Sequence, residues 1–514
     1  MTDTNFLMEE FDPFRKENWI RRFLDFDIQS FEKMLENNDE EFWQKKGEEK
    51  ALHLFRLVAQ HVPAYQQFLK LHDINPDMVK TIDDFVTVPV TTRKNYLEKY
   101  SITERSWDGK FDYDILAVSG GTIGDPRLWP RGNAQEFEAA IMHELLYNSV
   151  FEVSKYRTLL IVGFPLGIYV SGIATTMPSW LISSKLGYQL TIAAVGNKRD
   201  EILNVLKQSH EHYEQIIVTG HPFFVKDLVE SAQSYKIFKK NVRMKFMFSS
   251  EGFSEKWRSY LLSVSNNQFV SCDAINLYGS TDTLVTAFET PFSIFLKKQA
   301  EENAEFREKL KFPVALNVFQ YNPMMRYIET DSKDNLLITS ASGIPLVRFQ
   351  IGDRGRVHSL SEVKSVLDSY YNLKTEGGNW EKKYWKLPLL TLFGRSDYSI
   401  EFHVAHIKPE YIHFALDDPL FYEKITGKFS MRKYYTEAMD PVLEINIELN
   451  EGQDSDVRLE NDLNEKITAA LRSFDYRYEF LFNSSPSIAK PRIHLWPYQH
   501  EKYFKPGLKP RYIV

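Results

Sequence analysis

Cysteine is almost absent from this chain, because Cys272 is the single cysteine among 514 residues. One thiol cannot form an intramolecular disulfide, and it cannot supply a structural zinc site built from several cysteines. No nucleophile motif surrounds Cys272, so we expect a buried, inert thiol. Disulfide scaffolds and cysteine-rich zinc proteins are therefore excluded.

A surplus of positive charge is also absent. Lys and Arg number 63 against 70 Asp and Glu, a formal net charge of −7, and both signs are mixed along the chain. A dedicated nucleic-acid binder or a polybasic membrane anchor would need a basic surplus, which disfavours both classes. The first five residues, MTDTN, lack the basic region and apolar core of a signal peptide. A cytoplasmic enzyme without a nucleic-acid partner fits these absences best.

Long apolar runs are scarce, with one exception at residues 159–182. This stretch has no charged residue and is long enough to span a bilayer. Two prolines and three glycines interrupt it, with serines and threonines between them. We therefore expect a buried strand, a turn and a helix, and no membrane span.

The pattern that is present is typical of a layered α/β protein. Apolar residues at helical spacing predict helix within residues 42–69. Farther along, helices alternate with short apolar runs at 159–162, 190–194, 216–219 and 244–248. Such alternation favours a sheet with parallel pairing and helices on its faces.

The C-terminal part has a different character. Alternating apolar residues at 443–449 predict a half-buried strand, and one apolar stripe at 459–474 predicts an amphipathic helix. A chain of 514 residues is too long for one hydrophobic core of usual size. We therefore predict a large α/β domain over residues 1–394 and a small α+β domain over residues 395–514.

The most informative motif is the turn SGGTIGDP at residues 119–126, directly after the apolar run at 115–118. Glycines let backbone amides face a ligand, and nests of amides bind anions. Ser119 and Thr122 add hydroxyl donors for phosphate oxygens. We expect this turn where strand ends feed loops, the usual ligand-binding edge of an α/β sheet. It is not a Walker loop, because no Gly-Lys-Ser/Thr follows the glycines.

Four further segments carry aromatic, hydroxyl, carboxylate or cationic side chains: NLYGSTD at 276–282, VRFQIGDRG at 347–355, FGRSD at 393–397 and KPGLKPR at 505–511. With the glycine turn, they resemble in order the motifs of the adenylate-forming superfamily, which contains acyl-CoA synthetases, nonribosomal-peptide adenylation domains and luciferases. The segments FVTVPVTTR, TGHP and SEG, which begin at residues 85, 219 and 250, are similar to its phenylacetate–CoA ligase branch, which includes capsule-associated members. The resemblance runs from about residue 45 to the end.

The resemblance implies a fold and an activity. The fold would be a large ATP- and carboxylate-binding domain followed by a mobile C-terminal lid domain, with a hinge at Asp397. The activity would be Mg²⁺- and ATP-dependent activation of a carboxylic acid to its acyl-adenylate, followed by transfer of the acyl group to CoA. A carboxylate must then approach a polyphosphate, so catalysis would consist of charge neutralisation and positioning.

The resemblance also implies which residues bind the phosphates. Thr281 would hydrogen-bond the α-phosphate, and Asp282 would hold Mg²⁺, which prefers carboxylate and phosphate oxygens. Lys509 would bridge the α-phosphate and the substrate carboxylate as a point charge on a flexible stem. The β- and γ-phosphates would lie in the glycine turn, against Ser119, Gly120, Gly121, Thr122 and Gly124.

Other residues would bind the nucleoside and the acid. Tyr278 would stack on adenine, Asp353 would accept both ribose hydroxyls, and Arg395 would support the ribose. Further nucleotide-binding positions are Glu251, Gly252 and Gly279. The acyl pocket would be lined by Phe164, Tyr169 and His221.

Several plainer readings stay open. Tyr278 can be an ordinary core aromatic, and Asp353 can be a turn-forming aspartate beside Gly352. Residues 490–514 hold five other Lys and Arg residues besides Lys509. His143 and His221 receive no catalytic role, because an ionised carboxylate needs no proton removed before it attacks.

The acceptor and the class of function also stay open. The glycine that follows Gly-Arg-x-Asp in relatives is missing here, so the acceptor can be an amine or a carrier-protein thiol instead of CoA. A non-catalytic nucleotide-binding regulator on the same fold is the alternative from another class. The sequence specifies neither the acid nor the oligomeric state, and a homodimer is compatible with it. The residues near 359–386 suggest an added lid or partner surface.

Overall fold

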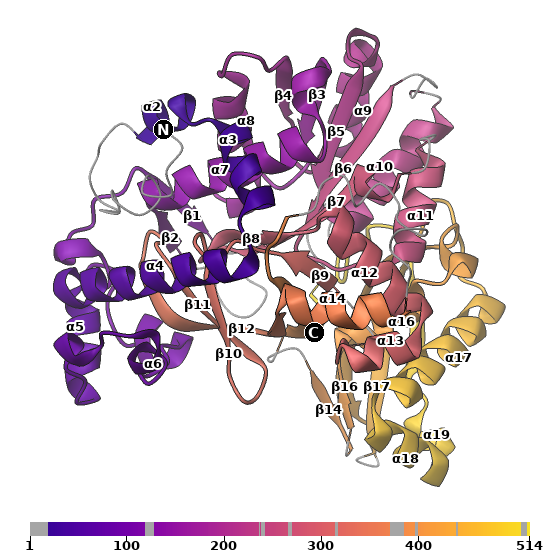
Figure 1. Cartoon of the computed structure of the whole chain (residues 1–514). Helices are drawn as coiled ribbons and strands as arrows, with labels where there is room; N and C mark the ends of the chain where they lie inside the picture. Colours follow the sequence, from indigo (N-terminus) through magenta and orange to yellow (C-terminus); the bar gives the residue numbers. More distant parts are fainter. Residues whose placement is uncertain are drawn as a thin grey trace.

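A computed structural model shows two units that share a deep interface (Figure 1). It describes residues 19–118, 128–235, 237, 242–265, 270–313, 317–370, 385–395, 399–403, 405–437, 440–504 and 511–514. We call residues 19–395 the large unit and residues 399–514 the small unit. Each unit has hydrophobic clusters of its own, and one cluster joins only residues 400–512. The predicted mixed α/β fold is confirmed.

One mixed sheet forms the centre of the large unit. Within the described residues it has eleven strands in the order β10-β11-β12-β13-β9-β8-β7-β6-β5-β3-β4. Their bounds are β3 Thr158–Val162, β4 Leu190–Ala194, β5 Gln215–Gly220, β6 Arg243–Ser249, β7 Ala274–Ser280, β8 Leu284–Phe288, β9 Asn317–Gln320, β10 Tyr327–Thr330, β11 Asn335–Ser340, β12 Leu346–His358 and β13 Leu389–Arg395.

The strands from β4 to β7 pair in parallel, as the alternating pattern predicted. Side chains alternate between the two faces of a strand, so β3 serves two cores at once. Leu160 and Val162 pack in one cluster with helices α7 and α8, while Leu159 and Ile161 pack in another with α9, α10 and α11. These helices span Asn133–Ser149, Val170–Ser183, Arg199–Ser209, Pro222–Ser234 and Glu255–Val264.

The uncharged stretch at 159–182 is therefore strand β3, a turn and helix α8, as expected. Pro178 lies inside α8. No helix in the described part of the chain is both long enough and apolar enough to cross a membrane.

From β7 onward the sheet becomes antiparallel. Helices α4 (Glu40–His61) and α5 (Pro63–Leu71) cover this half, and they correspond to the helix predicted within 42–69. Pro63 divides the two, because it lacks an N–H donor and fits the first turn of a helix. The remaining α-helices among the described residues of the large unit are α2 Trp19–Asp25, α3 Ile28–Asn37, α6 Ile82–Phe85, α12 Pro291–Glu302, α13 Ala304–Lys309 and α14 Leu360–Tyr370.

Part of the expected insertion is a packed helix. Leu360, Val363 and Leu367 of α14 are buried in a cluster with α12 and α13. Residues 371–384 lie outside the described residues. None of the described residues of the insertion lines the cavity between the two units.

The strand before the glycine turn departs from expectation. β1 (Ile115–Val118) pairs with β2 (Leu128–Arg131) in a separate two-stranded antiparallel sheet, and not with the parallel strands. Only Ala117 among its residues is fully buried, which does not suit a strand covered on both faces. The end of β1 still reaches the parallel strands' loops, because Val118 donates to the Ile168 carbonyl at 2.9 Å.

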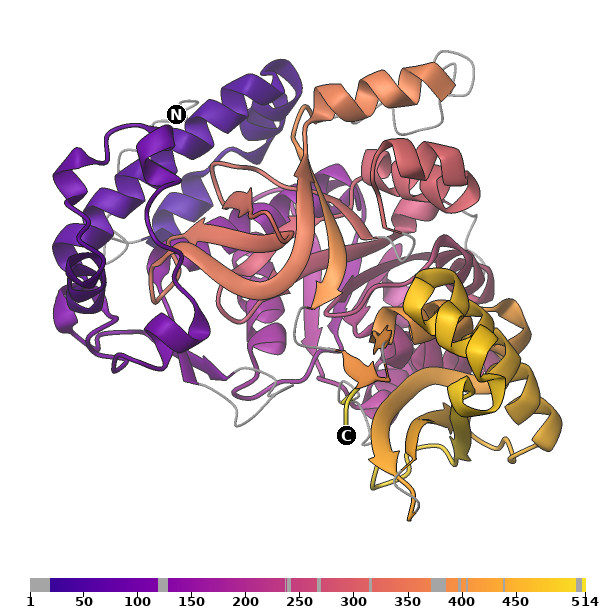
Figure 2. The ribbon, with the colours of Figure 1, turned by 90° about the horizontal axis from the view of Figure 1, so that it is seen from below.

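The described part of the small unit has a three-stranded sheet, β16-β17-β18, covered by helices, and a separate two-stranded sheet, β14-β15 (Figure 2). The predicted strand is β17, but it is buried on both faces and not half-buried, because Glu444, Asn446 and Glu448 are buried along with the apolar residues. The predicted amphipathic helix is α17, whose apolar stripe packs on the three-stranded sheet. Its elements are β14 Ile400–Phe402, β15 Ala405–Ile407, α16 Pro409–Leu416, β16 Ile425–Tyr435, β17 Pro441–Leu449, α17 Val457–Phe474, α18 Tyr476–Ser484, α19 Pro486–Ala489 and β18 Arg492–Trp496.

Cys272 lies behind β7, in the turn that precedes the strand. It is partly buried, and burial raises the pKa of its thiol. Both features suit the inert thiol that we expected.

Candidate active site

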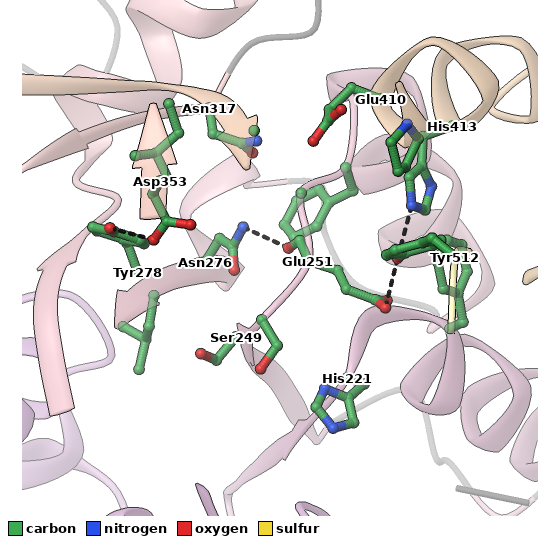
Figure 3. Close-up of a pocket in the computed structure, with 18 of the residues that line it drawn as sticks. His221, Ser249, Glu251, Asn276, Tyr278, Asn317, Asp353, Glu410, His413 and Tyr512 are labelled. Carbon is green, nitrogen blue, oxygen red and sulfur yellow. Dashed lines mark hydrogen bonds between the residues drawn. The ribbon is translucent and has the colours of Figure 1, made fainter. Parts of the chain in front are cut away.

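A cavity of about 1690 Å³ opens between the two units. Figure 3 shows part of its wall. The large unit contributes the ends of β6, β7 and β12, and the small unit contributes α16, β16 and the last residues of the chain. The expected site residues that border this cleft are Phe164, Tyr169, His221, Glu251, Gly252, Tyr278, Gly279, Thr281, Asp282 and Asp353.

Three other groups of expected residues cannot be placed. The glycine turn with Ser119, Gly120, Gly121, Thr122 and Gly124, the hinge residue Asp397 and the lysine Lys509 lie outside the described residues. For Arg395, the backbone is described, as the last residue of β13. Their roles stay predictions.

Strand β7 carries the central motif. Asn276 and Tyr278 lie on this strand, and Thr281 and Asp282 follow in the turn to β8. The Tyr278 ring is buried and packs on Phe319 with the ring centroids 6.0 Å apart. Its hydroxyl donates to Asp353 Oδ2 at 2.7 Å (Figure 3), so two residues 75 positions apart share one hydrogen bond.

Asp353 lies in a strand, which contradicts the alternative reading of a turn-forming aspartate beside Gly352. It belongs to the long strand β12 and pairs in register with Arg395 of β13, and the register shifts directly afterwards. Gly352 next to it has φ +94°, a conformation that L side chains rarely adopt. The irregular backbone turns the strand locally without ending it, which is why the sequence read as a turn.

Buried side chains hold the turn after β7 through hydrogen bonds to its backbone carbonyls. Gln135 Nε2 donates to the Asp282 carbonyl at 3.1 Å, and Arg326 donates to the Thr283 carbonyl from Nε at 3.1 Å and Nη2 at 2.8 Å. Arg326 is fully buried and forms an ion pair with Glu138, which Lys50 of α4 also contacts at 2.5 Å. A side chain at Gly279 would collide with the Leu284 carbonyl, so the tight hairpin requires glycine.

The donor set at this turn fits a magnesium ion bound together with a nucleotide. Mg²⁺ usually takes one or two protein carboxylates and completes its shell with phosphate oxygens and water. Asp282 supplies one carboxylate on the cleft wall, beside the Thr281 hydroxyl. Among the described residues, no group of three or more His, Cys, Asp or Glu could hold a metal without such a ligand.

Replacing Glu138 tests whether the buried charges support this turn. Glu138→Gln leaves Lys50 and Arg326 without their counter-charge in the core, which costs about 3–5 kcal/mol of unfolding free energy. Urea unfolding measures the loss. The control Glu201→Gln removes an exposed ion pair with Lys198, worth about 0–1 kcal/mol. Equal effects of the two substitutions would contradict a supporting role for the network.

The segment after β6 forms the next part of the wall. Asn276 Nδ2 donates to the Glu251 carbonyl at 2.9 Å, which fastens this segment to β7. Gly252 faces the amide of Asn317, and a side chain at this position would overlap that amide. Asn317 Oδ1, Asn276 Oδ1 and Glu251 Oε2 are buried and accept no hydrogen bond from any described residue.

Unpaired buried acceptors are costly, and a ligand with N–H or O–H donors would satisfy them. Sequence analysis missed Asn317. Its only signal is an amide at the start of a strand, which many ordinary loops share.

Another part of the cleft is lined by aromatic and histidine rings. Tyr169 begins α8 beside the end of β1, and the Phe164 ring meets His221 edge-on with centroids 5.6 Å apart. His143 also borders this part, and its Nδ1 lies 2.8 Å from the Ala139 carbonyl. Burial lowers the pKa of His143 to about 4, so the ring is neutral and satisfies the helix backbone, as a structural histidine does.

The small unit closes the other side with residues that sequence analysis also missed. Tyr512 donates to Glu251 Oε1 at 2.8 Å, and His413 Nε2 lies 2.9 Å from the same hydroxyl (Figure 3). Tyr512 lies three residues after Lys509 in the sequence. That position in the cationic tail is the only signal that could have drawn attention to it.

Two carboxylates meet at the N-terminus of α11. Asp417 of the small unit accepts from the Ser254 backbone amide at 3.1 Å, and Glu301 of α12 accepts from the Glu255 amide at 3.0 Å. Burial is the main cause that raises the pKa of Asp417 to about 6 and that of Glu301 to about 7.

Stability should therefore depend on the ionisation of Glu301. Its folded-state pKa of about 7 exceeds the ordinary 4.5, so the folded state holds the proton more tightly. The contribution of the protonated Glu301 side chain to the free energy of unfolding is complete below pH 4.5 and is lost as the pH rises through 7. Glu301→Gln keeps the acceptor oxygen and removes the charge. Between pH 5 and pH 8, the free energy of unfolding of the variant should therefore rise relative to that of wild type by on the order of 1–3 kcal/mol.

Urea unfolding at the two pH values measures this gain. Glu302→Gln, at the exposed neighbouring position, serves as the control and should follow wild type at both. A Glu301→Gln variant with the same pH dependence as wild type would show that Glu301 ionises normally.

The comparisons with known proteins identify the fold. The sequence matches no protein-family model and no curated protein. The structure overlaps a 2-hydroxyisobutyryl-CoA ligase in the postadenylation state in complex with 2-HIB-AMP, with a TM-score of 0.62 and 13% identity over 92% of this chain and 89% of that one. This chain therefore has the fold of the adenylate-forming ligases, the superfamily that its motifs resemble.

The same ligase in two other states overlaps less. The TM-score is 0.51 for an open conformation in complex with 2-HIB-AMP and CoA, at 13% identity over 92% of this chain and 91% of that one. It is 0.50 for the thioesterification state, at 13% identity over 92% and 89%. The overlap is therefore larger with the postadenylation state than with either of these two states.

Proposed function

We propose that this protein uses ATP to activate a carboxylic acid as its acyl-adenylate and then transfers the acyl group to an acceptor, with CoA as the leading candidate. The observation that carries the proposal is the single cleft. It gathers the β7 motif, the Glu251 segment, Asp353, the backbone beside Arg395 and the C-terminal residues, which lie far apart in the chain.

The size and polarity of the cleft support two substrates. Sites for one small molecule measure about 300–1,000 Å³, so about 1690 Å³ can hold a nucleotide and an acid together. The polar wall around Asp353 and Asp282 suits the nucleotide with its magnesium ion. The ring-lined wall around Phe164, Tyr169 and His221 suits the organic part of an acid.

The proposed roles follow from the chemistry. Tyr278 and Asp353 would hold the nucleoside, with Glu251, Gly252, Gly279 and Arg395 around it. Thr281 would bind the α-phosphate, and bound Mg²⁺, held by Asp282, would neutralise phosphate charge. The small unit, hinged at Asp397, would bring Lys509 to the reacting carboxylate.

Pyrophosphate exchange tests the activity directly. ATP and labelled pyrophosphate are incubated with the enzyme, Mg²⁺ and each member of a panel of carboxylic acids. We expect exchange with a subset of acids, because adenylation releases pyrophosphate reversibly. Absence of exchange with every acid would favour the nucleotide-binding regulator. With an active acid, CoA consumption and amine-dependent AMP release distinguish the acceptors.

Two substitutions test the catalytic assignments. Lys509→Ala should lower exchange at least 100-fold while ATP still binds, because the lost charge acts on the transition state. Asp353→Asn should mainly raise KM for ATP, since a neutral amide accepts the ribose hydroxyls less strongly. Lys490→Ala, which removes an exposed cation of the same C-terminal stretch outside the cleft, is the control for Lys509 and should stay within about threefold of wild type. Full exchange activity in Lys509→Ala would remove the catalytic assignment.

A further inference from the structure

The last four residues of the chain are joined to both units. We call residues 511–514 the C-terminal tail. Met431 of β16 donates to the Tyr512 carbonyl at 2.7 Å, and Val514 donates to the Met431 carbonyl at 3.2 Å. The tail therefore lies along β16 as a short extra strand of the small unit, with Met431 and Ile513 bridged in parallel.

The Tyr512 side chain crosses from the small unit to the large one. Its ring is buried and packs on Phe429, with centroids 5.0 Å apart. Its hydroxyl donates to Glu251 Oε1 at 2.8 Å, and His413 Nε2 approaches the same hydroxyl at 2.9 Å (Figure 3). His413 in turn stacks on Phe223 of α10, with parallel rings 5.6 Å apart.

Glu251 is a rigid acceptor for this hydrogen bond. It is buried, its backbone carbonyl accepts from Asn276, and Asn276 lies two residues before Tyr278 on β7. A hydrogen bond from Tyr512 to Glu251 thus connects the tail to the wall that would hold the nucleotide.

We propose that Tyr512 is a positioning residue for adenylation: its hydrogen bond to Glu251 holds the C-terminal tail, and with it the small unit, against the nucleotide wall. This inference rests on the proposed function. Tyr512 follows Lys509 by three residues, a chain length of at most about 11 Å, so holding the tyrosine restricts where the lysine can reach. A carboxylate that accepts from a buried tyrosine gives a stronger hydrogen bond than a neutral pair does.

The chain provides a matched control. Tyr498 of the small unit also donates to a carboxylate of the large unit, Asp227 Oδ2 of α10, at 2.5 Å. This pair does not border the cleft. Tyr498→Phe and Tyr512→Phe therefore remove hydrogen bonds of the same chemistry between the same two units, and only Tyr512→Phe releases the tail.

The first measurement is kinetic, with ATP and the acid found by pyrophosphate exchange. Tyr512→Phe should lower kcat of exchange about 10- to 100-fold, the loss expected for a buried hydrogen bond to a charged group, with KM for ATP changed less than threefold. Tyr498→Phe should stay within about twofold of wild type. A rise in KM at unchanged kcat would overturn the proposal, because Tyr512 would then act in nucleotide binding.

A double-substitution cycle separates the hydrogen bond from other roles of Glu251. Glu251→Ala and Tyr512→Phe should not add in kcat, because each breaks the same contact. Glu251→Gln keeps an acceptor oxygen and should recover part of the kcat lost in Glu251→Ala. Fully additive effects would show that the two residues act independently.

Hydrogen exchange tests the contact without any substrate. The Met431 and Val514 amides pair the tail with β16, so they should exchange about 10-fold faster in Tyr512→Phe and at the wild-type rate in Tyr498→Phe. Unchanged rates in Tyr512→Phe would overturn the proposed role in holding the tail. If no acid supports exchange of pyrophosphate, the proposed function and the kinetic role fall together, while these amides still decide whether Tyr512 holds the tail.

Discussion

The candidate site depends on the position of β7, the strand at which the sheet changes from parallel to antiparallel pairing. Buried charges hold it in place. Arg258 pairs with Glu289, and Glu289 Oε2 accepts from the Asn276 amide at 2.8 Å. Both side chains are almost fully buried, where an unpaired charge would be costly. The strand that carries Asn276 and Tyr278 is therefore held by the core and does not depend on a loop.

The change of strand direction explains why the cleft forms there. Parallel strands send their carboxyl ends to one edge, and β6 and β7 deliver the Glu251 segment and the Thr281–Asp282 turn to that edge. The antiparallel half brings β12 and β13 from the other side, so that Asp353 meets Tyr278 by a direct hydrogen bond. The small unit then covers the edge, with contacts from Asp417 and Tyr512 to the segment between β6 and α11.

Sequence patterns predicted the helices and strands themselves better than they predicted which elements lie beside one another. The short apolar runs of β3, β5 and β6, the stripe of α17 and the strand β17 all formed where they were predicted, because each depends on residues close in the chain. The partner of β1 was not predicted, because a short apolar run does not encode which strand lies beside it. The glycines near Asp353 suggested a turn. Pairing with β13, which the local sequence does not encode, keeps the residue in a strand.

By itself, the sequence determined the α/β class, the order of the motifs and the types of chemical groups available. These are local properties, set by composition and short spacings. Only the tertiary structure decided that Asn317, His413 and Tyr512 join the cleft, and that Tyr512 reaches Glu251 across 261 positions. Such contacts arise when two separately folded surfaces pack together, and no periodicity or motif within either segment records which side chains will meet.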